Sequence, residues 1–420
     1  MGDLNHADLA LTGWTIIVGV IGNVACALLG CYLVLRRLSL MGDAISHAVL
    51  PGIVLAFMLS GQLGGWPTVV GAMAVGMLTA FLTQGVHELG DVPEDASMGV
   101  VFTSLFALGV VLLHTIPHVD LDPGCVLYGL IETVALDLTP VFGVLVPRAL
   151  LTLVPVLLLT LGFIGLLWKE LKLMAFDPAL ATAMGLNATV LFYLLMGMTA
   201  AVTVASFEAV GSVLVVAMLI VPAATAHLLT DRFGWMMVWS AVIAAFAAVF
   251  GAIAGRLFST SVAGMMAVGV GLVFGLAVVF APRYGIVSKL LRNARLSLRI
   301  VSEDVIGLLY RAEEAGAAPV ALRGLLPALA RFRLLRRGLL QYTPDGVALT
   351  AAGRRSAESV VRAHRLWETY LEKDFALPLD HIHDPAERIE HYLGPGLQSE
   401  LARDLGEPKT DPQGKAIPPG

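Results

Sequence analysis

Long apolar runs dominate the first two thirds of the sequence. A helix of about 20 apolar residues is long enough to cross the roughly 30 Å hydrocarbon core of a bilayer. A mean hydropathy of +0.81 with only 14% charged residues excludes a soluble enzyme. About nine runs lie near residues 14–35, 44–60, 67–86, 97–116, 140–168, 188–206, 209–229, 235–255 and 262–281. The sequence therefore predicts an all-α polytopic membrane protein with about nine transmembrane helices, or eight to ten because segment 120–139 is ambiguous.

Basic residues divide the chain and set its orientation. Most of the 27 lysines and arginines follow Ser288, which indicates a membrane domain followed by a second, water-exposed domain. If the N-terminus lies outside, most basic residues beside the apolar runs fall on the cytoplasmic side, as the positive-inside rule requires. They are Arg36, Arg37, Lys169, Lys172, Arg232 and Arg283. No Lys or Arg precedes the first run, so we expect a retained span rather than a cleaved signal peptide.

Two pairs of ionisable residues interrupt the apolar runs. Asp43 and His47 lie four residues apart in GDAISHAVLPG, and His227 and Asp231 repeat this spacing in PAATAHLLTD. Helix positions i and i+4 share one face, so each pair offers half of a divalent-metal site. A charged group at membrane depth costs about 2.5–3.5 kcal/mol and usually marks function. We predict that the pairs face each other across a metal path. The alternatives are a helix cap at Asp43 and an interfacial position for the second pair.

The segment KELKLMAFDPALATAMGLN breaks the apolar pattern between two runs. Asp177 before Pro178 is typical of a helix N-cap followed by the first helical residue, and Gly185 is typical of a helix end. The pattern predicts a short helix on the cytoplasmic side.

Past the last apolar run, the pattern changes to shorter amphipathic segments. RNARLSLR is a basic juxtamembrane stretch, typical of a segment held at an anionic leaflet. SEDVIGLLYRAEEAG predicts a helix that begins at Ser302 or Glu303, and LRGLLPALARFRLLRRGLL predicts a second, basic helix. LLQYTPDGVALT predicts a hairpin, and helices follow near 351–374 and 385–404. This order of helices and hairpin indicates a small winged-helix-like fold.

The C-terminal segments carry a second set of candidate metal ligands. VRAHRLWETYL places an imidazole and a carboxylate at i and i+4, and HIHDPAERIEHYL presents two carboxylates and an imidazole on one helix face. Nitrogen and oxygen ligands without thiolates suit Mn, Fe, Co or Zn. The candidates are His364, Glu368, His383, Glu387, Glu390 and His391. The alternatives are a solvated helix face and a structural capping box formed by Asp384 and Glu387.

Four motifs in the membrane part are RRLSLMGDAISHAVLPG, EDASMGVVFTSLFALGVVLL, FDPALATAMGL and SFEAVGSVLVVAMLIVPAATA. Over about residues 10–285 the chain resembles the permease subunit of the manganese, zinc and iron ABC importers. The resemblance implies a multi-pass protein of the bacterial inner membrane. It also implies a cytoplasmic ATPase subunit, an extracytoplasmic metal-binding protein and a second permease subunit, identical or different, as partners. By this resemblance, the residues that coordinate the metal during transport are Asp43, His47, His227 and Asp231. The residues that couple the chain to the ATPase are Phe176, Asp177, Pro178, Ala179 and Gly185.

The C-terminal motifs are EDVIGLLYRAEE, LTAAGRRSAESVVRAHRLWETYL, HDPAERIEH and DPQGKAIP. They are similar to iron- and manganese-dependent repressors of the DtxR/MntR type over about residues 302–420. The similarity places the six candidate ligands at that family's metal positions and adds Asp304 as an N-terminal ligand. Gly307 replaces a second N-terminal carboxylate of the manganese-responsive branch, and the helix-turn-helix is shortened. We therefore expect metal sensing and dimerisation, and not sequence-specific DNA binding.

Together these features predict a permease subunit of an ATP-binding-cassette importer that moves a divalent metal into the cytoplasm. Manganese is the first choice, with zinc or iron as alternatives. No P-loop motif occurs in the sequence, so a separate subunit is expected to bind and hydrolyse ATP. The predicted domains are a transmembrane metal permease at 1–287, a linker with a degenerate winged-helix-like segment at 288–350, and a repressor-like metal-binding and dimerisation domain at 351–420.

The C-terminal domain is expected to bind cytoplasmic metal, to dimerise and to restrain transport, although the sequence is also compatible with activation. One rival interpretation is a membrane-tethered metal-responsive transcriptional regulator, which the basic segment 331–337 favours. A second rival, an intramembrane metallopeptidase, requires a His-Glu-x-x-His motif, and His87-Glu88 is followed by no matching histidine.

Overall fold

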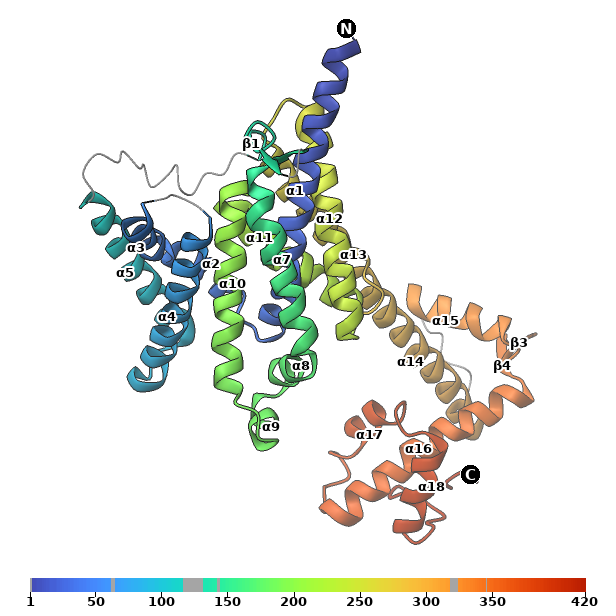
Figure 1. Cartoon of the computed structure of the whole chain (residues 1–420). Helices are drawn as coiled ribbons and strands as arrows, with labels where there is room; N and C mark the ends of the chain where they lie inside the picture. Colours follow the sequence, from blue (N-terminus) through green and yellow to red (C-terminus); the bar gives the residue numbers. More distant parts are fainter. Residues whose placement is uncertain (1, 62–64, 116–130, 142–143, 318–323, 345) are drawn as a thin grey trace. The chain divides into compact units, whose positions relative to one another are not determined.

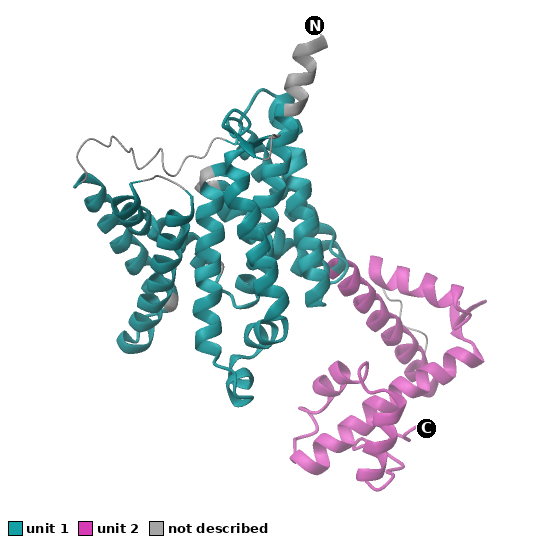
Figure 2. Ribbon diagram, viewed as in Figure 1, with its two compact units in different colours: residues 1–288 teal, residues 289–420 magenta. Residues whose placement is uncertain are grey.

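The computed structural model of the chain describes residues 2–61, 65–115, 131–141, 144–317, 324–344 and 346–420. The chain forms two compact units, Met1–Ser288 and Lys289–Gly420, which Figure 2 colours separately.

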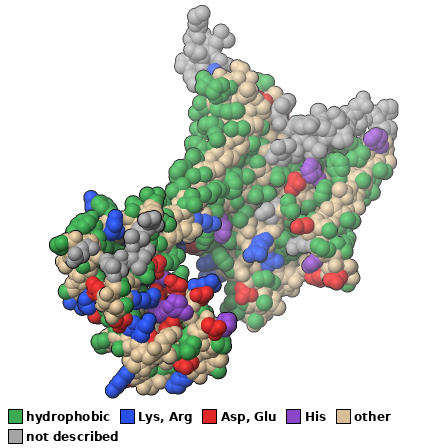
Figure 3. All heavy atoms as spheres, turned by 180° about the vertical axis from the view of Figure 1, so that it is seen from behind, with side chains coloured by type: hydrophobic (Ala, Val, Ile, Leu, Met, Phe, Trp, Pro, Cys, Tyr) green, Lys and Arg blue, Asp and Glu red, His purple; other side chains and the backbone are tan. Residues whose placement is uncertain are grey.

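Helices form almost all of the first unit (Figure 1). They are α1 (Gly2–Leu35), α2 (Ser39–Ala48), α3 (Leu50–Ser60), α4 (Trp66–Gly90), α5 (Glu94–His114), α7 (Arg148–Leu166), α8 (Trp168–Phe176), α9 (Pro178–Ala183), α10 (Ala188–Val210), α11 (Ser212–Leu229), α12 (Phe233–Leu257) and α13 (Val262–Phe280). Within the described residues, eight segments are long and apolar enough to cross a membrane, and Leu214–Leu229 is a shorter apolar helix. Figure 3 shows hydrophobic side chains over much of the surface of the first unit that is visible from this side. The predicted all-α polytopic fold is confirmed.

Helix α1 packs against α7, α10, α11 and α12 and so lies in the core of the first unit. Its Leu29, Tyr32 and Leu33 side chains are fully buried. Gly30 lies where α1 approaches α11 most closely, because a Cβ at this position would come within 1.6 Å of the Leu219 carbonyl oxygen. Small residues at helix crossings allow membrane helices to approach this closely.

Replacing Gly30 with Ala is expected to prevent correct packing of α1 on α11, because the added methyl group overlaps backbone atoms that cannot move independently. Overpacking of this kind costs on the order of 3 kcal/mol. Gly162→Ala in α7 is the matched control, since a Cβ there meets nothing within 4 Å. Thermal unfolding and monodispersity of both variants in detergent measure the difference. Equal unfolding temperatures would contradict the close approach.

Two segments of the first unit differ from the predicted spans. The second span is divided at Val49 into α2 and α3, and Pro51 lies in the first turn of α3, where a missing N–H is tolerated. The fifth span begins at Arg148 rather than near 140. The preceding residues form two antiparallel strands, β1 (Leu138–Val141) and β2 (Val144–Pro147). Part of the ambiguous segment 120–139, residues 120–130, lies outside the described residues.

The second unit contains α14 (Ile286–Glu314, which begins just before the unit boundary), α15 (Leu325–Arg336), β3 (Leu340–Thr343), β4 (Gly346–Leu349), α16 (Ala351–Phe375), α17 (His383–Ile389) and α18 (Pro395–Asp404). The predicted hairpin is confirmed, because β3 and β4 pair antiparallel. The predicted helix start at Ser302 or Glu303 is wrong: α14 is continuous through RNARLSLR, which contains no Pro or Gly to break it. The predicted helix at 385–404 is two helices, because α17 ends at Ile389 and α18 begins at Pro395, after Gly394.

The hydrophobic core of the second unit joins α14, α15, the hairpin and α16. Its buried members are Val305, Ile306, Ala330, Leu334, Leu340, Leu349 and Ala357. In the described residues, α15 is the only helix between α14 and β3, which agrees with the shortened helix-turn-helix seen in the sequence. Thr350 caps α16, since its hydroxyl oxygen accepts a 3.1 Å hydrogen bond from the Gly353 amide. This cap fixes the start of the helix that carries the first candidate metal ligands.

Candidate metal sites

The Asp43/His47 pair lies on α2. The His47 Nε2 and Asp43 Oδ1 atoms are 3.6 Å apart, so the predicted shared helix face is present. The side chains are 47% exposed for Asp43 and 37% for His47 within this single chain. The rings of Phe102 and Phe106 in α5 each lie 6.2 Å from the imidazole, between ring centroids. A carboxylate and an imidazole are thus held together beside apolar rings, with one side open.

The second predicted pair makes different contacts. The His227 ring stacks on Tyr284, with 6.5 Å between ring centroids. The Asp231 carboxylate forms an ion pair with Arg283 and accepts a 2.9 Å hydrogen bond from the Tyr284 hydroxyl. In the membrane unit, so far as the structure describes it, no three potential ligand atoms gather within 4.8 Å of one another. The structure therefore does not bring the two predicted pairs into one four-ligand cluster.

The predicted short helix is α9. The Asp177 carboxylate accepts a 2.9 Å hydrogen bond from the Leu180 amide as N-cap, and Gly185 adopts a left-handed φ of +85°, so both end signals are confirmed. Phe176, Leu180 and Met184 expose large apolar side chains around this short helix. A cleft of about 370 Å³ adjoins it. Its lining includes Arg36, His87, Glu88, Pro178, Ala179 and Thr182.

The first group of candidate ligands in the second unit joins α16 to α17. The Glu368 carboxylate lies 3.1 Å from His364 Nε2 and 2.9 Å from His383 Nδ1, and the two imidazole nitrogens are 3.1 Å apart. His364 and Glu368 are buried, whereas His383 is exposed. Three donor atoms thus converge, with one side accessible to solvent. The i and i+4 spacing on α16 brings His364 and Glu368 together, and α17 adds His383.

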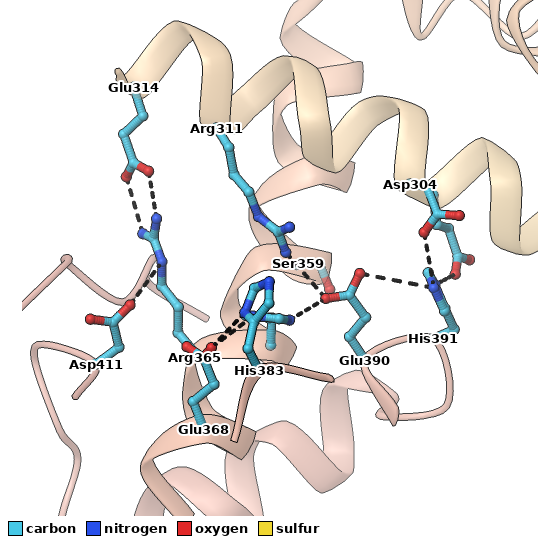
Figure 4. A network of polar contacts seen from close by, with 12 residues as sticks. Asp304, Arg311, Glu314, Ser359, Arg365, Glu368, His383, Glu390, His391 and Asp411 are labelled. Carbon is cyan, nitrogen blue, oxygen red and sulfur yellow. Dashed lines mark hydrogen bonds and ion pairs between the residues drawn. The ribbon is translucent and has the colours of Figure 1, made fainter. Parts of the chain in front are cut away.

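The second group joins α14 to the end of α17 (Figure 4). His391 Nε2 lies 3.1 Å from Asp304 Oδ1 and 3.9 Å from Glu390 Oε1. On the other side of the ring, Glu303 Oε2 lies 2.9 Å from His391 Nδ1. A carboxylate at this position orients an imidazole so that its other nitrogen faces a metal.

Glu390 connects the two groups. Its Oε2 atom lies 2.7 Å from His364 Nδ1 and 3.2 Å from Arg311 Nη2, while its Oε1 atom faces His391. The carboxylate is buried, and Figure 4 shows it between Arg311 and His391. A change at either group therefore reaches the other through one side chain.

The two groups fit a divalent transition metal by donor type and by spacing. Bonds of about 2.1 Å that meet at right angles place neighbouring donors about 3.0 Å apart, close to the separations in the first group. Imidazole and carboxylate donors without thiolates suit Mn, Fe, Co and Zn. Glu387 is exposed and belongs to neither group. The alternative capping box is absent, because α17 begins at His383 and no side chain caps it.

The clustered charges shift the pKa values of the buried His364 and the half-buried His391. Burial alone lowers the pKa of His391, but hydrogen bonds to Asp304 and Glu303 outweigh burial and raise this pKa to about 9. Burial also lowers the pKa of His364, yet hydrogen bonds with its two carboxylate neighbours leave it raised. At neutral pH, His391 of the metal-free chain is therefore in its charged form, with a proton on both ring nitrogens.

Metal binding at the second group is expected to release one of these protons, because Nε2 of His391 must lose its proton to become a ligand. Since the pKa is about 9, apparent metal affinity should rise about tenfold per pH unit from about pH 6 and level off above about pH 9. Calorimetry of the full chain in buffers with different ionisation enthalpies counts the protons released. Identical heats in all buffers would show that His391 is not a ligand.

Several residues beside the groups were not predicted from the sequence. Glu303 and Arg311 lie on α14, and their roles depend on how α14 packs against the end of α17. Arg365, adjacent to His364, is buried and donates a 3.0 Å hydrogen bond to Glu314, and its Nε atom lies 3.5 Å from Asp411 in the C-terminal segment. The DPQGKAIP motif is the signal that could have indicated this last contact.

Comparison with known proteins identifies the family. Residues 8–281 match the ABC 3 transport family, and residues 350–419 match the iron dependent repressor, metal binding and dimerisation domain. Because the first match covers more than half of the chain, the chain belongs to the ABC 3 transport family. The resemblances seen in both parts of the sequence are thus confirmed.

Individual relatives agree with this assignment. The chain is 45% identical over 294 residues to the manganese transport system membrane protein MntD of Bacillus subtilis, covering 69% of this chain and 98% of that protein. It is 37% identical over 361 residues to the zinc transport system membrane protein TroD of Treponema pallidum, covering 81% of this chain and 98% of that protein. The solved structure of PsaBC from Streptococcus pneumoniae in complex with Fab matches with a TM-score of 0.56 and 30% identity, covering 65% of this chain and 92% of that chain.

Proposed function

We propose that this chain is the permease subunit of an ATP-binding-cassette importer that carries a divalent transition metal, manganese first, into the cytoplasm. The Asp43/His47 pair carries the proposal, because it combines a carboxylate and an imidazole on one accessible face of a membrane segment. Membership of the ABC 3 transport family and relatives named for manganese and zinc transport support it. The chain would lie in the bacterial cell membrane with its second unit in the cytoplasm.

Two ligands from one chain leave most of a metal ion's coordination positions open. Water and a second permease subunit would supply the rest, and the exposed side of the Asp43/His47 pair leaves room for both. His227 and Asp231 remain proposed path residues. The ion pair between Asp231 and Arg283 supports an additional role, in which the end of α11 is held to the turn after α13.

A separate ATPase subunit would dock at α9. The exposed apolar side chains of Phe176, Leu180 and Met184 support this role, because such a group on a short surface helix favours a protein partner. The adjoining cleft offers Arg36 and Glu88 as charged groups for the same partner. An extracytoplasmic metal-binding protein would deliver the ion on the opposite side of the membrane.

The second unit would act as a metal-responsive regulator of transport. Its two ligand groups offer sites for the transported metal, and its match to a repressor metal-binding and dimerisation domain supports metal-dependent pairing of two copies. We propose that metal binding to this unit restrains transport when cytoplasmic metal is abundant. Manganese would then limit its own uptake.

Metal-resolved uptake tests the transport proposal. Cells that lack their own manganese importer would express this chain together with its ATPase and binding protein. We expect uptake of radioactive manganese that requires the chain, with competition by zinc and iron ranking the three metals. If the chain reaches the membrane and none of the three metals enters faster than in cells without it, the proposal fails.

A further inference from the structure

Helix α15 has two apolar faces. Ala330 and Leu334 are buried in the hydrophobic core of the second unit. On the other side, Leu325, Leu329 and Phe332 follow one another at i, i+4 and i+7, and they are 77%, 46% and 54% exposed. Helical periodicity therefore aligns them as one exposed stripe. An exposed apolar stripe on a folded unit marks an interaction surface.

Arginines surround this stripe. Arg331, Arg333 and Arg336 lie on α15, Arg337 follows it, and the helix contains no acidic residue. The Arg336 guanidinium lies over the Phe332 ring, 4.7 Å from its centroid, so a positive charge directly borders the apolar stripe. Across the described parts of the chain, no acidic side chain forms an ion pair with these four arginines. Their charge is thus available to an external anionic partner.

We propose that α15 binds an anionic lipid surface. Leucine and phenylalanine along a helix rimmed by arginines are typical of helices that lie in the interface plane of a bilayer. The long arginine stems can follow the apolar stripe while their guanidinium groups reach lipid phosphates. The cytoplasmic leaflet carries the required negative charge, and this chain is anchored in that membrane by its own spans.

Two other partners fit this surface less well. A second copy of α15 would bring the same four arginines against each other, and like charges across an interface cost several kcal/mol. DNA phosphates would satisfy the arginines but leave the leucine and phenylalanine side chains without an apolar partner. A bilayer satisfies both features at once. The inference is independent of which metal the chain transports.

The full chain in nanodiscs tests this proposal. A cysteine-free background would carry Leu329→Cys or, as matched control, Leu397→Cys, another exposed leucine in α18 of the same unit. Each variant would be labelled with a fluorophore, and quenching by nitroxide-labelled lipids would be measured. With about 30% anionic lipid we expect at least about threefold more quenching at 329 than at 397, because only the first lies on the stripe. High salt should reduce the difference.

Charge variants sharpen the test. Arg331→Gln and Arg336→Gln should each weaken docking about fivefold, since a basic residue near an anionic leaflet contributes about 1 kcal/mol. Three outcomes would overturn the proposal. The first is equal quenching at both positions. The second is a difference in quenching that depends on a second chain in the disc rather than on lipid charge. The third is a fluorescence change of the label at 329 when duplex DNA is added, without quenching by the labelled lipids.

Discussion

The Asp43→Asn variant is expected to import manganese at least about 100-fold more slowly than the wild-type chain. Removing even an outer residue that only orients a metal ligand costs about 10–100-fold in metal affinity or activity, and Asp43 is placed as a ligand itself. Asparagine has nearly the same shape, so α2 and its packing against α10 and α11 should persist. Initial uptake rates in cells with equal amounts of chain in the membrane measure the effect.

Asp95→Asn is the matched control, because Asp95 is an exposed carboxylate on α5 of the same unit. It should transport at the wild-type rate. Asp231→Asn separates the two roles proposed for that residue: a path ligand would lower uptake at unchanged thermal stability, whereas a purely structural partner of Arg283 would lower the unfolding temperature. Normal uptake by Asp43→Asn would remove the Asp43/His47 pair from the path.

The Glu390→Gln variant is expected to lose metal-dependent restraint of transport. Among the described residues, Glu390 is the one carboxylate that contacts both ligand groups, so its neutralisation should weaken metal binding at both, by about 10- to 100-fold. Glutamine still fits the buried position and can accept a hydrogen bond from Arg311. We expect wild-type uptake at low manganese and faster uptake than wild type at high manganese. Equilibrium dialysis of the full chain gives the affinities independently.

Glu400→Gln on α18 serves as the control for this variant, since Glu400 is exposed and lies in neither ligand group. A chain that ends at Ser288 should behave like Glu390→Gln at high manganese. If truncated and wild-type chains transport equally at every metal level, the second unit does not regulate transport. If Glu390→Gln binds metal with wild-type affinity, the assignment of Glu390 to the metal groups fails. The truncated chain then tests separately whether the second unit regulates transport.

The membrane fold could be predicted because the length of an apolar run limits what it can form. The prediction failed where apolar composition does not distinguish a helix from a strand: β1 and β2 are as apolar as a span, and Pro140 and Pro147 were the available warning. The start of α14 was misplaced because Ser302 is a good N-cap residue, yet its hydroxyl instead donates to the Leu298 carbonyl within the helix.

The candidate metal ligands could be predicted only where they lie close together in the sequence. His364 and Glu368 were found by helical spacing, which the packing of the unit then preserved. The contact of His391 with Glu303 and that of Glu390 with Arg311 are different, because they require α14 to pack against a segment 88 and 79 residues further along the chain, respectively. Such contacts leave no periodic pattern in either segment.

The position of Glu390 between the two groups has a consequence for how sharply the chain could respond to manganese. Without metal, the carboxylate is held by Arg311 and His364. An ion at the first group would bind Nε2 of His364 and leave the proton on Nδ1, which would then donate to Glu390 Oε2 and orient Oε1 toward the second group. Each ion would thus favour binding of the other, and coupling of this kind is reciprocal. Occupancy would change over a narrower range of concentration than for two independent sites, so the importer would ignore small fluctuations and respond at a threshold.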